Sequence, residues 1–306
     1  MYIHLTIIQI VFMPIEQFLT YIRHEKRYSP HTCESYENDL RQFSGYIRET
    51  FEMEVTEVKH TQVRDYMIFL LETGMSENSV GRKLSTLRSF YKYLLREEVI
   101  DSSPMALIKA PAVPKRLPVF IDDDKMDRLL DSKEFFDDSF PSVRNKVIIE
   151  TFFGTGMRLA ELLHLEDKDV NVYESVVRVL GKGNKERIIP ITKQLVNQIE
   201  AYIALKNQQN FDNKTDKLFV TDKGKDATRG FVYGIVKSYL THVTTQDKRS
   251  PHVLRHSYAT SMLNMGADLN DIKELLGHTS LAATQVYTHN TIEKLKLIYK
   301  QAHPKA

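Results

Sequence analysis

The chain has 306 residues, of which 42% are hydrophobic and 27% are charged. These shares are close to the averages of globular proteins and argue against a disordered chain or a coiled coil, while the length predicts two domains with separate cores. Cys33 is the only cysteine, which excludes an internal disulfide and a zinc site built on several thiolates, and it favours a reducing cytoplasm. The formal charge of +2 is weak evidence for a nucleic-acid partner.

The N-terminal segment 1–12 is interpreted as an extension that precedes the folded protein. Its apolar stretch 3–12 is too short to span a bilayer and has no Lys or Arg before it, which argues against a signal peptide and a membrane anchor. A helical pattern begins only after Met13, so we expect these residues to come from an upstream start codon. We expect no association with a membrane.

Residues 13–103 are predicted to form a helical domain. Ser29 and Pro30 form an N-cap and first-turn pair for its second helix, and Gly74 suits a left-handed cap after a third helix over 61–73. Apolar residues recur at helical spacing in the first, second and fourth helices: Ile15, Phe18, Leu19 and Ile22; Tyr36, Leu40, Phe43 and Ile47; Val80, Leu84, Leu87, Tyr91 and Leu94.

The fourth helix also carries basic residues, with no acidic residue between positions 78 and 96. They are expected on the side opposite the apolar stripe, namely Arg82, Lys83, Arg88, Lys92 and Arg96. Most charged helix faces are simply solvated, but such faces normally mix both signs. We therefore favour contact with a DNA phosphate backbone over a solvated face.

Residues 104–118 are predicted to be an extended, semi-rigid, basic connector. Proline fixes φ and restricts the residue before it, and the segment contains four prolines: Pro104, Pro111, Pro114 and Pro118. Lys115 and Arg116 are candidates for DNA contact along a duplex, although an ordinary tether between domains remains the alternative. The second domain is expected over 119–306.

The second domain is expected to be mainly helical with a small β-sheet. Asp122 is the predicted cap of its first helix, and a longer apolar helix follows over 143–153. Strands are expected over 176–180 and 187–190, joined by a glycine-rich turn. A third short strand is expected over 218–221.

Two basic residues of this domain are candidates for binding an anion. Arg158 lies where a glycine-rich turn enters a helix, beside unpaired backbone N–H groups, although an ordinary surface ion pair with Glu161 is the alternative. Lys182 is flanked by glycines at the tip of the hairpin, where an ammonium can donate a proton to a leaving oxygen. The alternatives are a solvated turn lysine, or Lys185 in the same role.

A later helix, opened by Ser250 and Pro251, carries further candidates. His252 and Arg255 are three residues apart and therefore share a face. His256 lies four residues after His252, a spacing that also suits zinc, and this is the main rival interpretation. A helical zinc-protease motif would place Glu where Val253 stands, and a third ligand is missing.

The C-terminal part supplies a third histidine and a tyrosine. Gly277 is predicted to cap a helix and to leave His278 at an exposed corner, and Tyr287 follows nine residues later. A tyrosine near a chain end usually serves only in packing. An unperturbed phenol is only about 0.1% ionised at neutral pH, so a nucleophilic role requires cations and a base nearby.

In their order along the chain, these motifs resemble the catalytic signature of the tyrosine recombinases, in particular the Xer recombinases. The motifs are Gly156-x-Arg158-x-x-Glu161-Leu162, a hairpin lysine, His252-Val253-Leu254-Arg255-His256, Gly277-His278 and Tyr287. The resemblance covers nearly the whole chain from about Met13. It departs from the family at Lys305, where arginine is usual, and in the N-terminal extension.

The resemblance implies a metal-independent and ATP-independent transfer of DNA strands, without a cofactor. Tyr287 would attack the scissile phosphate, form a 3′-phosphotyrosyl bond and release a 5′-hydroxyl. Lys182 would protonate the leaving oxygen, and His252 would assist proton transfer at the nucleophile. Arg158 and Arg255 would hold the non-bridging oxygens of the phosphate.

His278 would add a third donor to the same phosphate. The implied fold is a C-shaped clamp around double-stranded DNA, made of a helical core-binding domain and an α+β catalytic domain. The implied assembly is a homo-tetramer, or a hetero-tetramer with a second recombinase, and a septal DNA translocase is a further implied partner. The C-terminal helix would dock into a neighbour or pack on its own domain, through a stripe of Ile292, Leu295, Ile298 and Tyr299.

The Xer group implies resolution of chromosome dimers during segregation. Three alternatives stay open at this point: an integrase of a mobile element, a DNA-relaxing topoisomerase with the same chemistry, and a DNA-binding regulator. Strand exchange between two labelled sites separates a recombinase from a topoisomerase. A regulator with a vestigial pocket is disfavoured because no catalytic position is missing.

Overall fold

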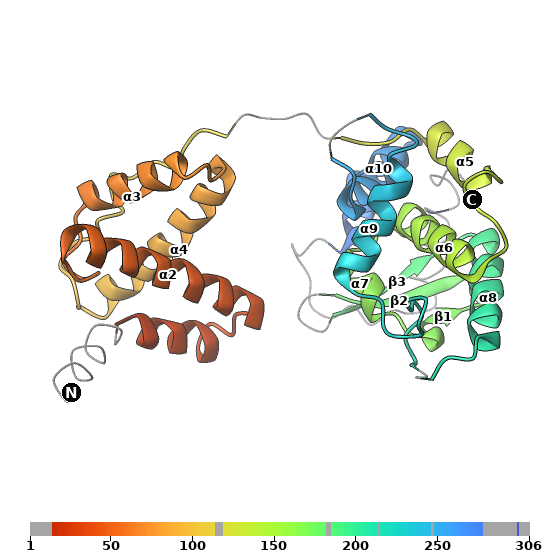
Figure 1. The fold of residues 1–306 in the computed structure, drawn as a ribbon, viewed down its shortest axis with the longest axis horizontal. Helices are drawn as coiled ribbons and strands as arrows, with labels where there is room; N and C mark the ends of the chain where they lie inside the picture. The colour runs from red at the N-terminus through yellow and green to blue at the C-terminus, as the bar shows by residue number, and fades with distance from the viewer. Residues whose placement is uncertain are drawn as a thin grey trace. The chain divides into compact units, whose positions relative to one another are not determined.

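The computed structural model describes residues 14–113, 119–181, 185–212, 215–245, 248–277 and 299. The chain divides into two compact units, Met1–Arg116 and Leu117–Ala306 (Figure 1). The described residues of each unit bury an extensive cluster of apolar side chains. Each unit thus has a hydrophobic core of its own.

The described part of the first unit is helical, as the sequence predicts. Its helices are 14–24, α2 (Pro30–Phe51), α3 (His60–Glu72) and α4 (Glu77–Arg96). Every residue of the predicted apolar stripes is buried in the core except Tyr36, which packs against it. These stripes therefore hold the helices together.

The predicted helix boundaries of this unit are confirmed. Ser29 is the N-cap of α2, and its hydroxyl accepts a hydrogen bond from the backbone N–H of Thr32 at 3.3 Å. Pro30 is the first residue of that helix. Gly74 follows α3 with a φ of +83°, a left-handed conformation that glycine adopts without strain.

The expected connector differs from the prediction at its start. Residues 104–107 form turns instead of an extended chain, and Met105 and Ile108 are buried in the core of the first unit. The Arg88 guanidinium donates to the carbonyl of Ile108 at 2.9 Å and fastens this segment to α4. The prediction of an extended chain is therefore wrong for 104–108, because two apolar side chains gain more from burial than the prolines gain from extension.

The second unit combines helices with a small sheet, also as predicted. Its helices are α5 (Asp123–Asp131), α6 (Phe140–Thr155), α7 (Leu159–His164), the short η1 (Asp167–Asp169), α8 (Lys193–Gln208), α9 (Arg229–Leu240), α10 (Pro251–Asn264) and α11 (Leu269–Leu276). Helix α6 is buried along most of its length and lies inside the unit (Figure 1). The predicted apolar helix over 143–153 is this central helix.

The sheet has the antiparallel order β1-β2-β3, with β1 (Val170–Asn171), β2 (Val176–Leu180) and β3 (Glu186–Pro190). The two predicted strands are confirmed as β2 and β3. The strand expected over 218–221 is wrong, because only Val220 of that segment pairs, in an isolated bridge with Asp226. Three consecutive apolar residues there are all buried, so the segment fills the core instead of alternating between two faces.

The C-terminal Tyr299 packs on its own unit. Its side chain is buried in a cluster with Tyr258 and Met262, and its hydroxyl donates to the carbonyl of Gly154 at 3.2 Å. The rest of the predicted C-terminal stripe lies outside the described residues. Within the described ranges, no helix is long and apolar enough to cross a membrane.

Candidate active site

A sharp turn between α6 and α7 positions Arg158. Gly156 ends α6 with a φ of +59°, and a Cβ atom at this position would meet the ring of Tyr258 at 2.5 Å. Only glycine therefore fits this turn without displacing the core. Arg158 then stands at the N-cap of α7, with about a third of its side chain exposed.

The Glu161 carboxylate lies between two arginines. Its Oε1 accepts from Arg158 Nη1 at 2.8 Å and from Arg187 Nη1 at 2.7 Å. Its Oε2 accepts from the Arg158 backbone N–H at 2.6 Å and from Arg187 Nη2 at 2.9 Å. Burial raises the pKa of Glu161, but the bonds from Arg187 and Arg158 outweigh it and hold that pKa below its usual value. The carboxylate is therefore ionised at neutral pH.

Arg255 projects from the buried side of α10 and is 9% exposed. Its guanidinium donates to the carbonyl of Gly156 at 2.6 Å and to that of Leu276 at 2.8 Å. Burial and the neighbouring charge of Arg158 lower the pKa of Arg255 to about 10. The group therefore keeps its positive charge at neutral pH.

Three consecutive carbonyls at the end of α11 each accept a hydrogen bond from a different arginine. Arg187 donates to Leu275 at 2.9 Å, Arg255 donates to Leu276 at 2.8 Å, and Arg158 donates to Gly277 at 2.9 Å. The last carbonyls of a helix have no partner within the helix and carry the negative end of its dipole. The end of α11 therefore aligns the three guanidinium groups.

This arrangement, called the arginine cluster below, consists of Arg158, Arg187, Arg255 and Glu161. Three guanidinium groups against one carboxylate leave two positive charges in a largely buried environment. Such an excess favours an anion, because fixed donors in a medium of low polarity stabilise negative charge more than water does. Of the three arginines, Arg158 is the most exposed and is the one best placed to reach a ligand.

The structure brings together two of the six predicted catalytic residues, Arg158 and Arg255. His252 lies one turn before Arg255 on α10, with an exposed side chain. Three others, Lys182, His278 and Tyr287, lie outside the described residues. The hairpin predicted to carry the lysine is closed at its base by a hydrogen bond of 2.7 Å between the Gly181 N–H and the Lys185 carbonyl.

Arg187 is not among the predicted site residues, and Glu161 enters the prediction only as part of the Arg158 motif and as a possible surface ion-pair partner of Arg158. The strand pattern contained a signal for Arg187, because it occupies the inward phase of β3 together with Ile189. A charged residue on the buried face of a strand requires a counterion. That requirement points to a buried acidic residue nearby, which is Glu161.

The zinc interpretation of the two histidines on α10 gains no support from the described residues. His252 and His256 belong to no group of three or more metal-ligating side chains in that part of the chain. His252 is exposed, whereas His256 is partly buried.

The predicted basic side of α4 is not a single exposed face. Lys83 is buried, and its ammonium donates to Asp39 at 2.8 Å, so its predicted position on the side opposite the apolar stripe is wrong. Arg82 forms a bidentate ion pair with the same carboxylate, at 2.6 and 2.8 Å, and half of its side chain remains exposed. The Thr86 hydroxyl also donates to Asp39, at 2.9 Å. A buried acid of α2 thus organises the basic residues at the start of α4.

The remaining predicted DNA contacts differ in their surroundings. Arg88 fastens residues 104–108, as described above. Arg96 packs over the ring of Tyr21 at 4.2 Å and bonds its hydroxyl at 2.7 Å. Lys92 is exposed on α4. Lys115 and Arg116 lie outside the described residues.

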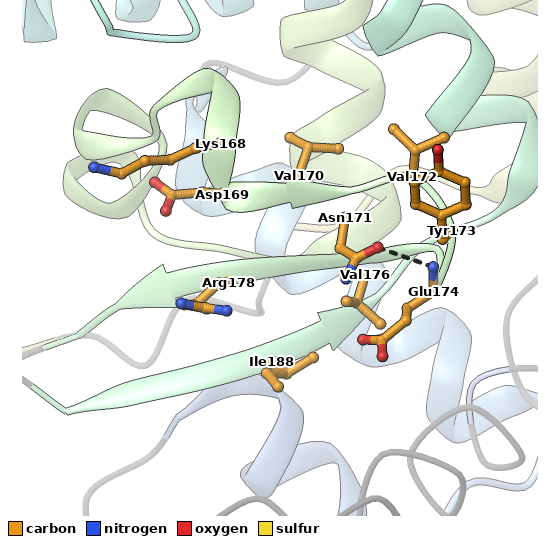
Figure 2. Close-up of a pocket in the computed structure, with 10 residues that line it drawn as sticks. All are labelled: Lys168, Asp169, Val170, Asn171, Val172, Tyr173, Glu174, Val176, Arg178 and Ile188. Carbon is orange, nitrogen blue, oxygen red and sulfur yellow. Dashed lines mark hydrogen bonds between the residues drawn. The ribbon is translucent and has the colours of Figure 1, made fainter.

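A cavity of about 340 Å³ lies on the open face of the sheet, away from the arginine cluster. Figure 2 shows Arg178 of β2 and Ile188 of β3 along this cavity, where they pair across the two strands. Arg187 pairs with Val179 in the next register position, and both side chains point to the buried face. The sheet thus separates this cavity from the arginine cluster.

Two family models match the chain. The Phage integrase family matches residues 120–294, and the N-terminal SAM-like domain of phage integrases matches residues 15–98. The first model covers the arginine cluster, and the second covers α2 to α4.

Curated relatives match over nearly their whole length. The chain is 38% identical over 298 residues to tyrosine recombinase XerC of Halalkalibacterium halodurans, which covers 95% of this chain and 97% of the relative. It is 34% identical over 319 residues to XerC of Chlorobaculum parvum, with 95% and 94% covered. It is also 34% identical over 293 residues to tyrosine recombinase XerD of Staphylococcus haemolyticus, with 95% and 99% covered.

Solved structures share the fold. The XerH site-specific recombinase bound to its palindromic difH substrate in a post-cleavage complex matches with a TM-score of 0.70 and 22% identity, over 92% of this chain and 83% of that one. The Tn1549 transposon integrase bound to transposon right end DNA matches with a TM-score of 0.71 and 17% identity, over 92% and 97%. The family models and the curated relatives show that the chain belongs to the phage integrase family, and the arginine cluster is consistent with this assignment. The protein is a site-specific tyrosine recombinase of the Xer type.

Proposed function

We propose that this recombinase cleaves and rejoins double-stranded DNA through a 3′-phosphotyrosyl intermediate formed on Tyr287. The phenol oxygen attacks the scissile phosphorus and gives up its proton with the assistance of His252, the bond to the 5′-oxygen breaks, and the departing oxygen takes a proton from Lys182. Attack by a 5′-hydroxyl reverses these steps and rejoins the strands. One ester is exchanged for another of similar energy, so the proposed reaction consumes no ATP.

The observation that carries this proposal is the convergence of Arg158 and Arg255 on adjacent carbonyls, those of Gly277 and Leu276. Two guanidinium groups held this close match the two non-bridging oxygens of one phosphodiester. Negative charge grows on those oxygens in the transition state, and fixed cations stabilise it without reorganisation. His278 follows Gly277 directly in the sequence, which supports its role as a third donor.

His252 is proposed to assist proton transfer at the tyrosine. Its exposed position on α10, one turn before Arg255, is compatible with contact to a bound substrate. The positive charge of the arginine cluster takes the place that a metal ion occupies in other phosphoryl-transfer enzymes. The proposed chemistry is therefore independent of metal ions.

The proposal is tested with a nicked DNA site that traps the covalent intermediate. Wild-type protein should yield a DNA-linked band in the presence of a chelator and in the absence of ATP, whereas Tyr287→Phe should yield none. A band of equal intensity from Tyr287→Phe would refute the assignment of the nucleophile. Loss of the wild-type band in chelator alone would refute metal independence.

We further propose that the first unit binds the phosphate backbone of the same DNA. Lys92 and the exposed half of Arg82 are the α4 residues whose surroundings support this role. Lys115 and Arg116 are retained as contacts of the connector. A tightly ordered guanidinium such as that of Arg82 loses little conformational freedom when it meets a phosphate.

The biological role that we propose is resolution of chromosome dimers in the cytoplasm. The relatives named XerC and XerD support this role, and a tetramer on two DNA sites with one or two kinds of subunit is the proposed assembly. A septal DNA translocase is proposed as a further partner. Recombination between two labelled sites, with and without a second recombinase of the same cell, distinguishes the homo-tetramer from the hetero-tetramer.

A further inference from the structure

Arg187 is buried and donates hydrogen bonds to Glu161 and to the end of α11. Its side chain is 7% exposed, and its fork-shaped guanidinium donates to both oxygens of Glu161 and to the carbonyl of Leu275. A planar guanidinium makes these three bonds from three separate nitrogens held in a fixed fork, whereas a lysine would have to reach all three acceptors from a single nitrogen. Arg187 therefore joins β3 to the start of α7 and to the end of α11.

The partner of Arg187 is also the partner of Arg158. Both arginines donate to the same carboxylate oxygen of Glu161, at 2.7 and 2.8 Å. A carboxylate shared between two guanidinium groups neutralises each of them only in part. Arg187 thereby leaves Arg158 with positive charge that a lone ion pair with Glu161 would cancel.

Arg187 also anchors the first of the three carbonyls that align the cluster. Leu275 bonds Arg187, and the next two carbonyls bond Arg255 and Arg158. The guanidinium lies against Gly277, where an added Cβ would meet it at 3.1 Å. The position of the helix end, and hence the spacing of the other two arginines, depends on this contact.

We propose that Arg187 is a positioning residue for strand cleavage, which sets the charge and spacing of Arg158 and Arg255 without touching the DNA. This inference rests on the proposed function of the arginine cluster. It predicts that the cleavage rate follows the net charge of the cluster, which a purely structural role of Arg187 would not predict. Wild type carries two net positive charges in the cluster, Arg187→Met carries one, and the double variant Arg187→Met/Glu161→Gln carries two again.

The double variant is the decisive test. The substitution Glu161→Gln keeps a side-chain amide oxygen for the Arg158 backbone N–H, so the start of α7 retains its cap. The single-turnover rate of covalent trapping on the nicked site is measured at saturating protein, and DNA affinity is measured separately. We expect Arg187→Met to lower the trapping rate about 100-fold, near the lower limit for loss of a direct donor. We expect Arg187→Met/Glu161→Gln to trap DNA at least about tenfold faster than Arg187→Met.

The matched control is Arg178→Met, on the neighbouring strand and the opposite face of the sheet (Figure 2). It removes the same side chain from the same sheet and should trap at the wild-type rate. Arg187→Lys restores the charge but not the fork, and its rate should lie between those of wild type and Arg187→Met.

Each outcome decides the proposal. A double variant no faster than Arg187→Met, or an Arg187→Met variant equal to wild type, would overturn it. If Arg187→Met does not fold, Arg187→Gln replaces it in both comparisons, and failure of both to fold would assign Arg187 to stability alone. Failure of the wild type to trap, or trapping by Tyr287→Phe, would instead refute the proposed function, whatever the Arg187 variants do.

Discussion

The two units each contain a buried carboxylate that binds two basic side chains, yet the two clusters differ in what surrounds them. Asp39 in the first unit accepts hydrogen bonds from Arg82, Lys83 and the hydroxyl of Thr86, which all lie on α4. Glu161 in the second unit accepts from two arginines on different elements, Arg158 at the start of α7 and Arg187 on β3. The first cluster joins α2 to α4. The second joins residues of α7, β3 and α11.

A cluster that only stabilises the fold differs from a candidate anion site in where its surplus charge lies. In the first unit the surplus positive charge belongs to Arg82, which is half exposed and screened by water. In the second unit a third arginine, Arg255, adds positive charge in a buried place, where its guanidinium donates to the carbonyls of Gly156 and Leu276. Surplus positive charge that is buried, instead of exposed to water, indicates a site for an anion.

The largest expected effect tests the structural cluster. Asp39→Ala leaves the Lys83 ammonium buried without its counterion, so we expect the free energy of unfolding to fall by about 3–5 kcal/mol. Urea denaturation of the full chain measures it. The control is Glu37→Ala on the same helix, whose exposed pair with Arg41 is worth less than about 1 kcal/mol. Equal losses of unfolding free energy in the two variants would show that the buried ion cluster stabilises the protein no more than a surface ion pair does.

The next effect tests the reactive cluster. Arg158→Ala and Arg255→Ala should each lower the rate of covalent trapping by about 10²- to 10³-fold, because each removes a proposed donor to the phosphate. Arg255→Ala should also destabilise the protein by about 1–3 kcal/mol, since it leaves the buried carbonyls of Gly156 and Leu276 without this donor. Trapping rates and thermal unfolding of both variants measure this contrast. Wild-type trapping by either variant would show that the cluster does not hold the reacting phosphate.

The smallest effect compares the two clusters under acid. Burial raises the pKa values of Asp39 and Glu161, but their basic partners outweigh it, so both lie below their usual values of 3.8 and 4.5. The stabilisation is therefore fully present above those usual values and is lost as pH falls through the lowered pKa values. Each carboxylate contributes at most about 1.4 kcal/mol per pH unit to that loss.

Unfolding free energies measured from neutral pH down to about pH 2 check this dependence. Asp39→Asn and Glu161→Gln should each remove the contribution of one carboxylate, and the other contribution should persist. An unchanged acid dependence in both variants would mean that other carboxylates control it.

The local structure of this protein follows from residues close together in sequence. Ser29 with Pro30 begins a helix, and Gly74 and Gly277 end helices, because caps and left-handed turns depend on a few neighbouring side chains. The strands β2 and β3 follow from β-branched runs on either side of a glycine-rich turn. Residues 218–221 mislead for the same reason, since a short apolar run has the same composition whether it pairs or fills a core.

The two arginines proposed to be catalytic could be anticipated from the sequence, but their arrangement could not. The order of motifs along the chain predicts that Arg158 and Arg255 converge. It does not predict that Glu161 is buried and shared, or that Arg187 completes the cluster, because these contacts join residues 26 and 88 positions apart. The basic residues of α4 illustrate the same limit, since Asp39 lies 44 positions before Lys83.

The amino-acid order alone thus dictates where helices and strands begin, which faces are apolar, and which side chains have the chemistry for phosphoryl transfer. Packing in three dimensions decides which of the many charged residues are buried and which carboxylate each one meets. The physical reason is that capping and periodicity are short-range properties of the backbone. The energy of a charge, in contrast, depends on burial and on partners that distant segments bring to it.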